Sequence, residues 1–174
     1  MTVIGKDRTG LVESIARVVA DHGGNWLESR MCRLGGEFAG ILRIHVPAGQ
    51  QQALVQALKE LASRGLTVVA LPDPPTPAAG PMRLTVLEIV GHDRPGIVRQ
   101  ITRALANQGV NVEELSTECV SAPMSGEMLF KARARLGIPA HCDVAALRAE
   151  LEKTAGDLMV DISFAEVGAA KPAE

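Results

Sequence analysis

The chain has 174 residues, enough for two small domains, each with a hydrophobic core of its own. Hydrophobic residues make up 47% and charged residues 22%, a balance that excludes a largely disordered chain. The net charge of −2 excludes the strong positive field of a typical nucleic-acid-binding or membrane-surface protein. The sequence shows neither a signal peptide nor an apolar run of bilayer length, so we expect a cytoplasmic protein without membrane contact.

The cysteines are few, odd in number and not arranged in C-x-x-C pairs. They are Cys32, Cys119 and Cys142. This arrangement predicts neither a disulfide framework nor a zinc site nor an iron–sulfur cluster, and it suits the reducing cytosol. We therefore expect no metal and no cofactor.

The first half of the chain predicts two amphipathic helices between short strands. The helices are expected near Leu11–His22 and Gln51–Arg64, and Gly65 ends the second one. The opening strand is predicted to be short, because Met1 aligns with the middle of the corresponding strand in the second half. Either the true start lies upstream, or another chain or segment completes the sheet.

A proline-rich segment at residues 72–81 separates the first domain, placed at 1–71, from the second domain, placed at 82–167. The segment holds five of the ten prolines of the chain and predicts a semi-rigid, extended linker. The last residues, 168–174, are expected to form a disordered tail.

The second half predicts the element order βαββαβ. Arg83–Val90 is apolar and rich in β-branched residues, as in a strand. Pro95 is placed at the first position of a helix that Gly109 ends in a left-handed conformation. A hairpin, a second helix and a last strand are expected at Val112–Val120, Met128–Leu136, Val144–Thr154 and Leu158–Phe164.

Both halves therefore predict the same α+β fold, a ferredoxin-like βαββαβ sandwich. Each sandwich has a four-stranded antiparallel sheet with two helices on one face. In the strand Met128–Leu136, alternate apolar residues are expected to face the helices, and the basic residues are expected to face away. These residues are Phe130, Ala132, Ala134 and Leu136 on the apolar side, and Lys131, Arg133 and Arg135 on the basic side.

The two halves are also copies of each other in sequence. With Gly5 placed on Gly91, the alignment runs without a gap as far as Glu28 on Glu114, and residues 5–10 (GKDRTG) meet residues 91–96 (GHDRPG). The later match of residues 36–37 with residues 126–127, both Gly-Glu, requires four extra residues in the second copy. These fall in Ser121–Gly126, which predicts an insertion in a turn.

Few side chains suit catalysis or the recognition of bases. Aromatic residues are too scarce for the stacking surface of an RNA-binding sheet, and no Ser or Cys lies in a nucleophile motif. His92 and Asp93 could form a base and its orienting group, but adjacent residues in a loop seldom face each other. We therefore predict no catalytic residue, no enzyme and no direct contact with nucleic acid.

The loop between the first strand and the first helix of each copy is the remaining candidate site. In residues 93–96 (DRPG) the proline begins the helix, and the glycine leaves the first amides exposed to a carboxylate. Asn111 opens the next strand, is expected beside this loop, and offers donors and an acceptor. Alternatively, Asp93 caps its own helix and Asn111 makes the turn after Gly109.

These residues resemble the ACT domain, a small-molecule regulatory module of enzymes of amino-acid metabolism. The resemblance rests on G-x-D-R-P-G-I-V at 91–98 and G-x-N at 109–111, and it covers both copies. It implies ligand binding at the loop and at the asparagine-bearing strand, often across an interface between two ACT domains. The implied ligand-binding residues are His92, Asp93, Pro95, Gly96, Ile97 and Asn111, and in the first copy Asp7, Gly10, Leu11 and Asn25. The first copy departs from the pattern at Lys6 and Thr9.

The tandem arrangement, with residues 28–31 (ESRM) and 34–39 (LGGEFA), is similar to the family of glycine cleavage system transcriptional repressors. This resemblance implies a homodimeric regulator of glycine and one-carbon metabolism. Such a protein senses glycine or a similar amino acid and acts through a transcriptional activator or a metabolic enzyme rather than by binding DNA. Two alternatives stay open: a ligand-free protein–protein interaction module, or a detached regulatory subunit of an enzyme of amino-acid metabolism.

Overall fold

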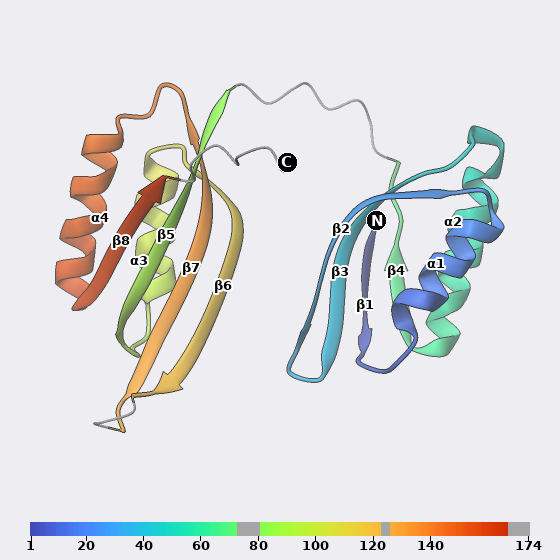
Figure 1. Ribbon diagram of the computed structural model, residues 1–174, viewed down its shortest axis with the longest axis horizontal. Helices are drawn as coiled ribbons and strands as arrows, with labels where there is room; N and C mark the ends of the chain where they lie inside the picture. The colour runs from blue at the N-terminus through green and yellow to red at the C-terminus, as the bar shows by residue number, and fades with distance from the viewer. Residues whose placement is uncertain (73–80, 123–125, 167–174) are drawn as a thin grey trace, which may run out of the picture. The chain divides into compact units, whose positions relative to one another are not determined.

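The computed structural model describes residues 1–72, 81–122 and 126–166 (Figure 1). The chain divides into two compact units, Met1–Pro75 and Thr76–Glu174, called the first and second domains below. The predicted linker at 72–81, apart from its end residues, and the predicted tail at 168–174 lie outside the described residues.

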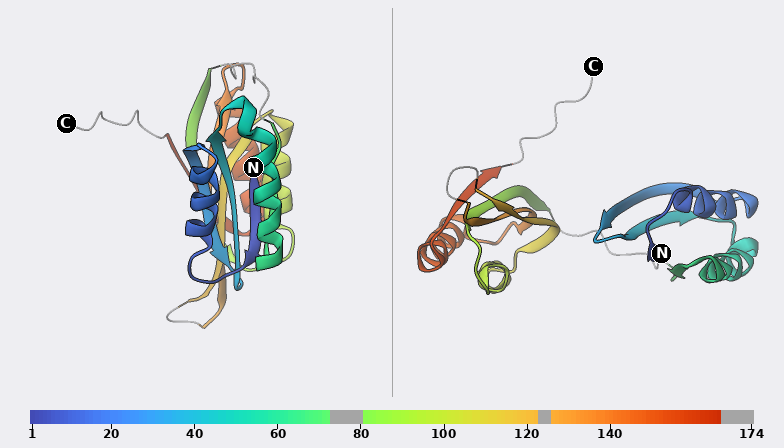
Figure 2. Two further views of the ribbon diagram at one scale, coloured as in Figure 1. Left: turned by 90° about the vertical axis from the view of Figure 1, so that its right-hand side faces the viewer. Right: turned by 90° about the horizontal axis from the view of Figure 1, so that it is seen from below.

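The first domain has the predicted order βαββαβ, with a short 3-10 helix on either side of its second helix. Its elements are β1 (Thr2–Lys6), α1 (Leu11–Asp21), β2 (Asn25–Leu34), β3 (Glu37–His45), η1 (Ala48–Gln50), α2 (Gln51–Glu60), η2 (Leu61–Arg64) and β4 (Leu66–Val69). The antiparallel sheet has the order β2-β3-β1-β4, and both helices lie on one of its faces (Figures 1 and 2).

The second domain repeats this architecture with longer strands. Its elements are β5 (Met82–His92), α3 (Ile97–Asn107), β6 (Asn111–Ser121), β7 (Met128–Pro139), α4 (Val144–Leu158) and β8 (Val160–Glu166). The antiparallel sheet order is β6-β7-β5-β8, which is equivalent to the order in the first domain. The predicted ferredoxin-like sandwich is therefore present twice. As predicted, the opening strand β1 is short, with 5 residues against 11 in β5.

Each domain has its own core between the sheet and the helices. In the second domain the predicted apolar side of β7 is buried against the helices, as Phe130 and Leu136 show with 8% and 0% exposure. Leu147 and Leu151 of α4 are fully buried in the same core. The core of the first domain contains Ile15 of α1, which packs together with buried apolar residues of the sheet. Separate cores explain why each copy of the repeat forms a complete sandwich.

The basic side chains of β7 lie on the outer face of the sheet, also as predicted. Arg133 Nε is 3.7 Å from Glu88 Oε1, and Arg135 Nη1 is 3.7 Å from Glu114 Oε2. These cross-strand ion pairs balance most of the positive charge of the stripe. The outer face therefore offers little of the unbalanced positive charge with which proteins bind the phosphates of nucleic acids.

Several predicted boundaries in the second domain are wrong by a few residues. α3 begins at Ile97 and not at Pro95, because Gly96 has a φ of 98° and is not helical. Leu158 belongs to the end of α4 rather than to the last strand. The strand β8 begins only after Met159, whose φ of 53° ends the helix in the left-handed region.

The insertion in the β6–β7 hairpin is longer than the sequence alignment predicts. Arg33 pairs with Phe38 in the first domain, whereas the aligned residue Cys119 pairs with Phe130 in the second. Five positions separate the first pair and eleven the second, so the insertion has six residues and not four. The match of the two Gly-Glu sequences led to the wrong length for the insertion. The longer β6–β7 hairpin has one more cross-strand residue pair, Ser121 with Met128, beyond the point where the β2–β3 hairpin turns.

Candidate functional site

In both domains the loop between the first strand and the first helix ends on a glycine with a left-handed backbone. The φ angle is 88° at Gly10 and 98° at Gly96, a conformation that favours glycine because it has no Cβ atom. The next residues, Leu11 and Ile97, are only 3% and 2% exposed. These two buried side chains fix the start of each helix to the core, and the loop lies at the surface before it.

Among the residues that the structure describes, no side chain caps the start of α1 or of α3. The alternative in which Asp93 caps its own helix is therefore wrong. In contrast, Asp143 Oδ1 caps α4 and accepts hydrogen bonds from the amides of Ala145 and Ala146 at 2.9 and 3.1 Å. The first amides of α3 have no acceptor within the helix, so they are able to donate hydrogen bonds to an anion.

The end of the neighbouring hairpin holds the loop backbone in the same way in both domains. The Asp7 amide donates to the Gly36 carbonyl, and the Asp93 amide donates to the Met128 carbonyl, each at 2.9 Å. The preceding side chains also pair with the hairpin: Lys6 with Glu37, and His92 Nδ1 with Glu127 Oε2 at 3.6 Å. His92 is therefore engaged with a glutamate and not with Asp93 as a catalytic pair.

The aspartates of the two loops have different neighbours. In the first domain Arg33 Nε lies 2.6 Å from Asp7 Oδ2, so the carboxylate is neutralised by an ion pair. In the second domain the aligned residue is Cys119, whose thiol lies close enough to Asp93 for the two groups to interact electrostatically. Desolvation of the thiol and the adjacent Asp93 carboxylate raise the pKa of Cys119 above its ordinary value. Within the described ranges, no cationic side chain pairs with Asp93.

Two arginines extend the candidate site of the second domain, and the sequence analysis missed them. An open hollow at the start of α3 is lined by Pro95, Gly96, Arg99, Gln100 and Arg103. The aligned positions in the first domain hold Glu13 and Arg17, which pair with each other at 3.6 Å. The sequence did contain a signal for this feature, since the two arginines lie one helical turn apart. Like charges at this spacing repel each other unless an anion lies nearby.

Asn111 does not lie beside the loop of its own domain, so this prediction is wrong. Asn111 pairs with Gly137, which pairs with Leu84 near the start of β5, whereas the loop follows His92 at the end of β5. Eight residues of strand at about 3.3 Å each place the two ends roughly 26 Å apart. The physical reason is that α3 runs back along the sheet before β6 begins. Asn25 likewise opens β2 at the end of the sheet remote from Asp7.

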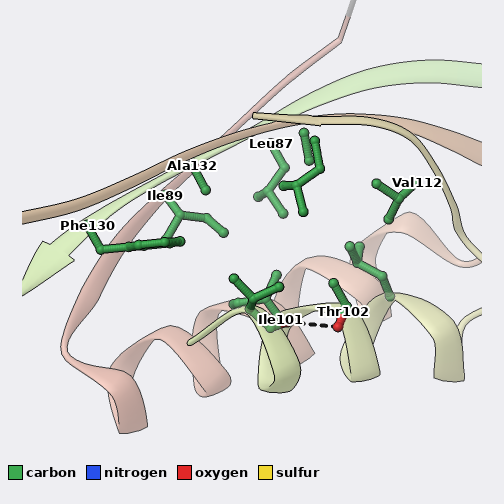
Figure 3. Close-up of a pocket in the computed structure, with 11 residues that line it drawn as sticks. Leu87, Ile89, Ile101, Thr102, Val112, Phe130 and Ala132 are labelled. Carbon is green, nitrogen blue, oxygen red and sulfur yellow. Dashed lines mark hydrogen bonds between the residues drawn. The ribbon is translucent and has the colours of Figure 1, made fainter. Parts of the chain in front are cut away.

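A small cavity inside the second domain does not offer an alternative ligand site. A small apolar cavity of about 20 Å³ lies between α3 and the sheet, lined by Ile89, Ile101, Val112 and neighbouring apolar side chains (Figure 3). Thr102 borders it, but its hydroxyl donates to the Val98 carbonyl at 2.7 Å. A space for about one water without polar partners does not suit a charged ligand.

The electrostatic contact between Asp93 and Cys119 leads to a prediction. In a chain whose other cysteines are changed by Cys32→Ser and Cys142→Ser, Asp93→Asn is expected to lower the pKa of the Cys119 thiol, because the neighbouring negative charge is lost. More thiolate is then present at pH 8, and alkylation by the uncharged reagent iodoacetamide becomes faster. The rate should be measured from pH 7 to 10; identical pH profiles with and without Asp93 would contradict the contact.

The structure adds two findings on site types. In residues 1–72, 81–122 and 126–166, no helix combines the length and the apolar character needed to cross a membrane. No group of three His, Cys, Asp or Glu side chains within those ranges is arranged to hold a metal ion.

Comparison with known proteins gives matches over both domains. Two family models, both described as the ACT domain, match residues 1–69 and 85–130. The chain is 28% identical over 172 residues to the glycine cleavage system transcriptional repressor of Escherichia coli (strain K12), covering 94% of this chain and 84% of that protein.

Solved structures resemble the chain over nearly its whole length. A crystal structure described as an unknown protein from Galdieria sulphuraria has a TM-score of 0.79 at 30% identity, with 95% of each chain covered. A structure assigned to a glycine cleavage system transcriptional repressor has a TM-score of 0.67 at 20% identity, covering 94% of this chain and 92% of the other. The second likeness shows the same fold.

Proposed function

This chain belongs to the ACT domain family, with two ACT domains in tandem, and on this basis we propose that it is a regulatory protein that senses a small amino acid, glycine or one of similar size. The proposed site is the loop before α3, with Asp93, Pro95, Gly96 and Ile97 as its centre. His92 supports the loop through Glu127. Asn111 contributes only to a site that a second copy of the chain completes.

The observation that carries the proposal is the uncapped start of α3 next to a carboxylate without a cationic partner among the described residues. A free amino acid has a carboxylate for the helix amides and an ammonium group for Asp93. A carboxylate at a helix start gains about 0.3–1 kcal/mol, and up to about 2 kcal/mol when it is partly buried. The arginines at the hollow, Arg99 and Arg103, add positive charge on the carboxylate side.

The regulatory target is proposed from the Escherichia coli relative described above. That protein is named a transcriptional repressor of the glycine cleavage system, which supports a role in glycine and one-carbon metabolism for this chain. The net charge of −2 and the paired arginines of β7 support action through a partner, an activator or a metabolic enzyme, rather than through DNA. We propose a cytoplasmic, non-enzymatic protein, and its free cysteines agree with that compartment.

Calorimetric titration of the full chain with each standard amino acid tests the sensor function. Glycine has five heavy atoms, and a ceiling of about −1.5 kcal/mol per atom limits its binding free energy to about −7.5 kcal/mol. The dissociation constant is therefore expected at a few micromolar or weaker. At such an affinity the occupancy of the site follows the concentration of the metabolite. Absence of heat from every amino acid, together with an unchanged melting temperature, would contradict the sensor function.

A second candidate function, a protein–protein interaction module, is favoured by an apolar surface on the first domain. Ile4, Ile41 and Val69 are 50%, 65% and 54% exposed, and the strand register gathers them on the outer face of the sheet: Ile41 and Val69 both flank Thr2. Exposed apolar side chains gathered on a sheet face are typical of contact surfaces. A second copy of the chain is the partner we expect first.

Substitution within this surface tests the interaction. Ile41→Lys is expected to weaken self-association at least tenfold, because a charge then has to be desolvated in the contact. Val12→Lys is the matched control, since Val12 is 45% exposed on α1, away from the outer face. Light scattering over a concentration series measures the mass; a monomeric wild-type chain, or equal effects of the two variants, would contradict the module.

A further inference from the structure

The residue next to the aspartate of the loop differs between the two ACT domains. Arg33 of β2 and Cys119 of β6 are aligned in the repeat, and each lies next to the aspartate of its own loop. The loop backbones are held alike, by hydrogen bonds of 2.9 Å from Asp7 and Asp93 to the hairpin. The side chain next to the aspartate is therefore the chemical difference between the two loops that bears directly on the charge of the carboxylate.

We propose that Arg33 determines how many ligands the chain binds: its ion pair with Asp7 excludes the ammonium group of an amino acid from the first domain and confines binding to the second. This inference rests on the function proposed above. It assigns Arg33 as a specificity-determining residue and Cys119 as the neutral counterpart that leaves Asp93 available. The expected stoichiometry is one amino acid per chain, although the chain contains two ACT domains.

The exclusion has two physical causes. Arg33 is held 2.6 Å from Asp7 by its own strand, so its local concentration far exceeds that of a free ligand in solution. Its guanidinium also repels an incoming ammonium group, whether or not the ion pair opens. A ligand as small as glycine makes few other contacts with which to offset this competition.

The second domain lacks this competitor. Cys119 has a neutral thiol near pH 7, since the Asp93 charge and desolvation raise its pKa. Asp93 thus keeps its negative charge and, within the part of the chain that the structure describes, has no cation to balance it. An ammonium group would supply that balance.

Exchanging the two residues tests the inference. Wild-type chain and the variants Arg33→Cys and Cys119→Arg are titrated calorimetrically with glycine and the other standard amino acids. Wild type is expected to bind one equivalent, Arg33→Cys two equivalents, and Cys119→Arg to lose at least tenfold in affinity. Arg33→Lys keeps the positive charge and should still bind one equivalent. Arg30→Cys and Glu118→Arg are the matched controls, because both positions are exposed on the same strands.

The outcomes separate the inference from the sensor function. Two equivalents bound by the wild type, or a greater loss of binding in Asp7→Asn than in Asp93→Asn, would overturn the role of Arg33 while leaving the sensor function intact. Absence of binding in every variant would overturn both. Thermal unfolding followed by circular dichroism verifies that each variant is folded, so that a lost site is not mistaken for a lost domain.

Discussion

Replacing Leu151 by alanine is expected to lower the free energy of unfolding of the second domain by about 2–5 kcal/mol. Leu151 is 0% exposed in α4 and belongs to the core that joins the helices to the sheet. The substitution removes buried apolar contacts and leaves a cavity that the surrounding residues fill only in part. Chemical denaturation followed by circular dichroism measures the change.

The control for this substitution lies on the same helix. Lys153 is exposed, so Lys153→Ala is expected to change the free energy of unfolding by no more than about 0.5 kcal/mol. Because the two domains have separate cores, amide hydrogen exchange should show the Leu151→Ala effect in α3, α4 and the β5–β8 sheet. A cost below about 1 kcal/mol, or a loss of protection in the first domain instead, would contradict the described packing.

Gly91→Ala is expected to destabilise the second domain by about 1–3 kcal/mol through steric overlap. A Cβ atom at Gly91 would lie 2.6 Å from Val160 Cγ1 and 2.8 Å from Val160 Cα, and a backbone atom moves aside only at a cost. Gly91 precedes His92 and Asp93, so the displacement of β8 would also disturb the proposed site. Gly5 meets the same constraint, because a Cβ atom there would overlap the Gly65 carbonyl oxygen.

Gly156→Ala makes the same chemical change as Gly91→Ala but is expected to have the opposite effect on stability. Gly156 lies inside α4, and a Cβ atom there would have no neighbour within 4 Å. Alanine in a helix is favoured over glycine by roughly 1 kcal/mol, so this variant should be more stable than the wild type. Thermal unfolding of Gly91→Ala and Gly156→Ala measures the difference. Equal shifts of the two melting temperatures in the same direction would contradict the close approach of β5 and β8.

The repeated fold could be predicted from the sequence because its signals are local. Helical spacing of apolar residues, alternation along Met128–Leu136 and the glycines that end helices each depend on neighbours a few positions away. Gly109 has the predicted left-handed backbone, with a φ of 68°, and Gly65, which was predicted to end a helix, has a φ of 76°. The family resemblance rests on the same short motif, which is why it is visible in both copies.

The candidate site was predicted less completely because it depends on contacts between distant segments. The ion pair of Arg33 with Asp7 exists only because the β2–β3 hairpin brings position 33 to the end of β1. The misplacement of Asn111 had a different cause. A strand that follows a crossover helix runs parallel to the first strand. It therefore begins at the end of the sheet where the first strand begins, which is opposite to the end that carries the loop. That rule was available from the predicted topology alone.

The central claim is that a small amino acid binds at the loop of the second domain. Two-dimensional amide NMR spectra of the ¹⁵N-labelled full chain, recorded during titration with glycine and then with the other small amino acids, test it most directly. We predict saturable shifts of the amides of residues 93, 94 and 96–99, with the amides of residues 7–13 unchanged and the shifts abolished in Asp93→Asn. Shifts confined to residues 7–13, or spectra unchanged at millimolar ligand, would contradict the claim.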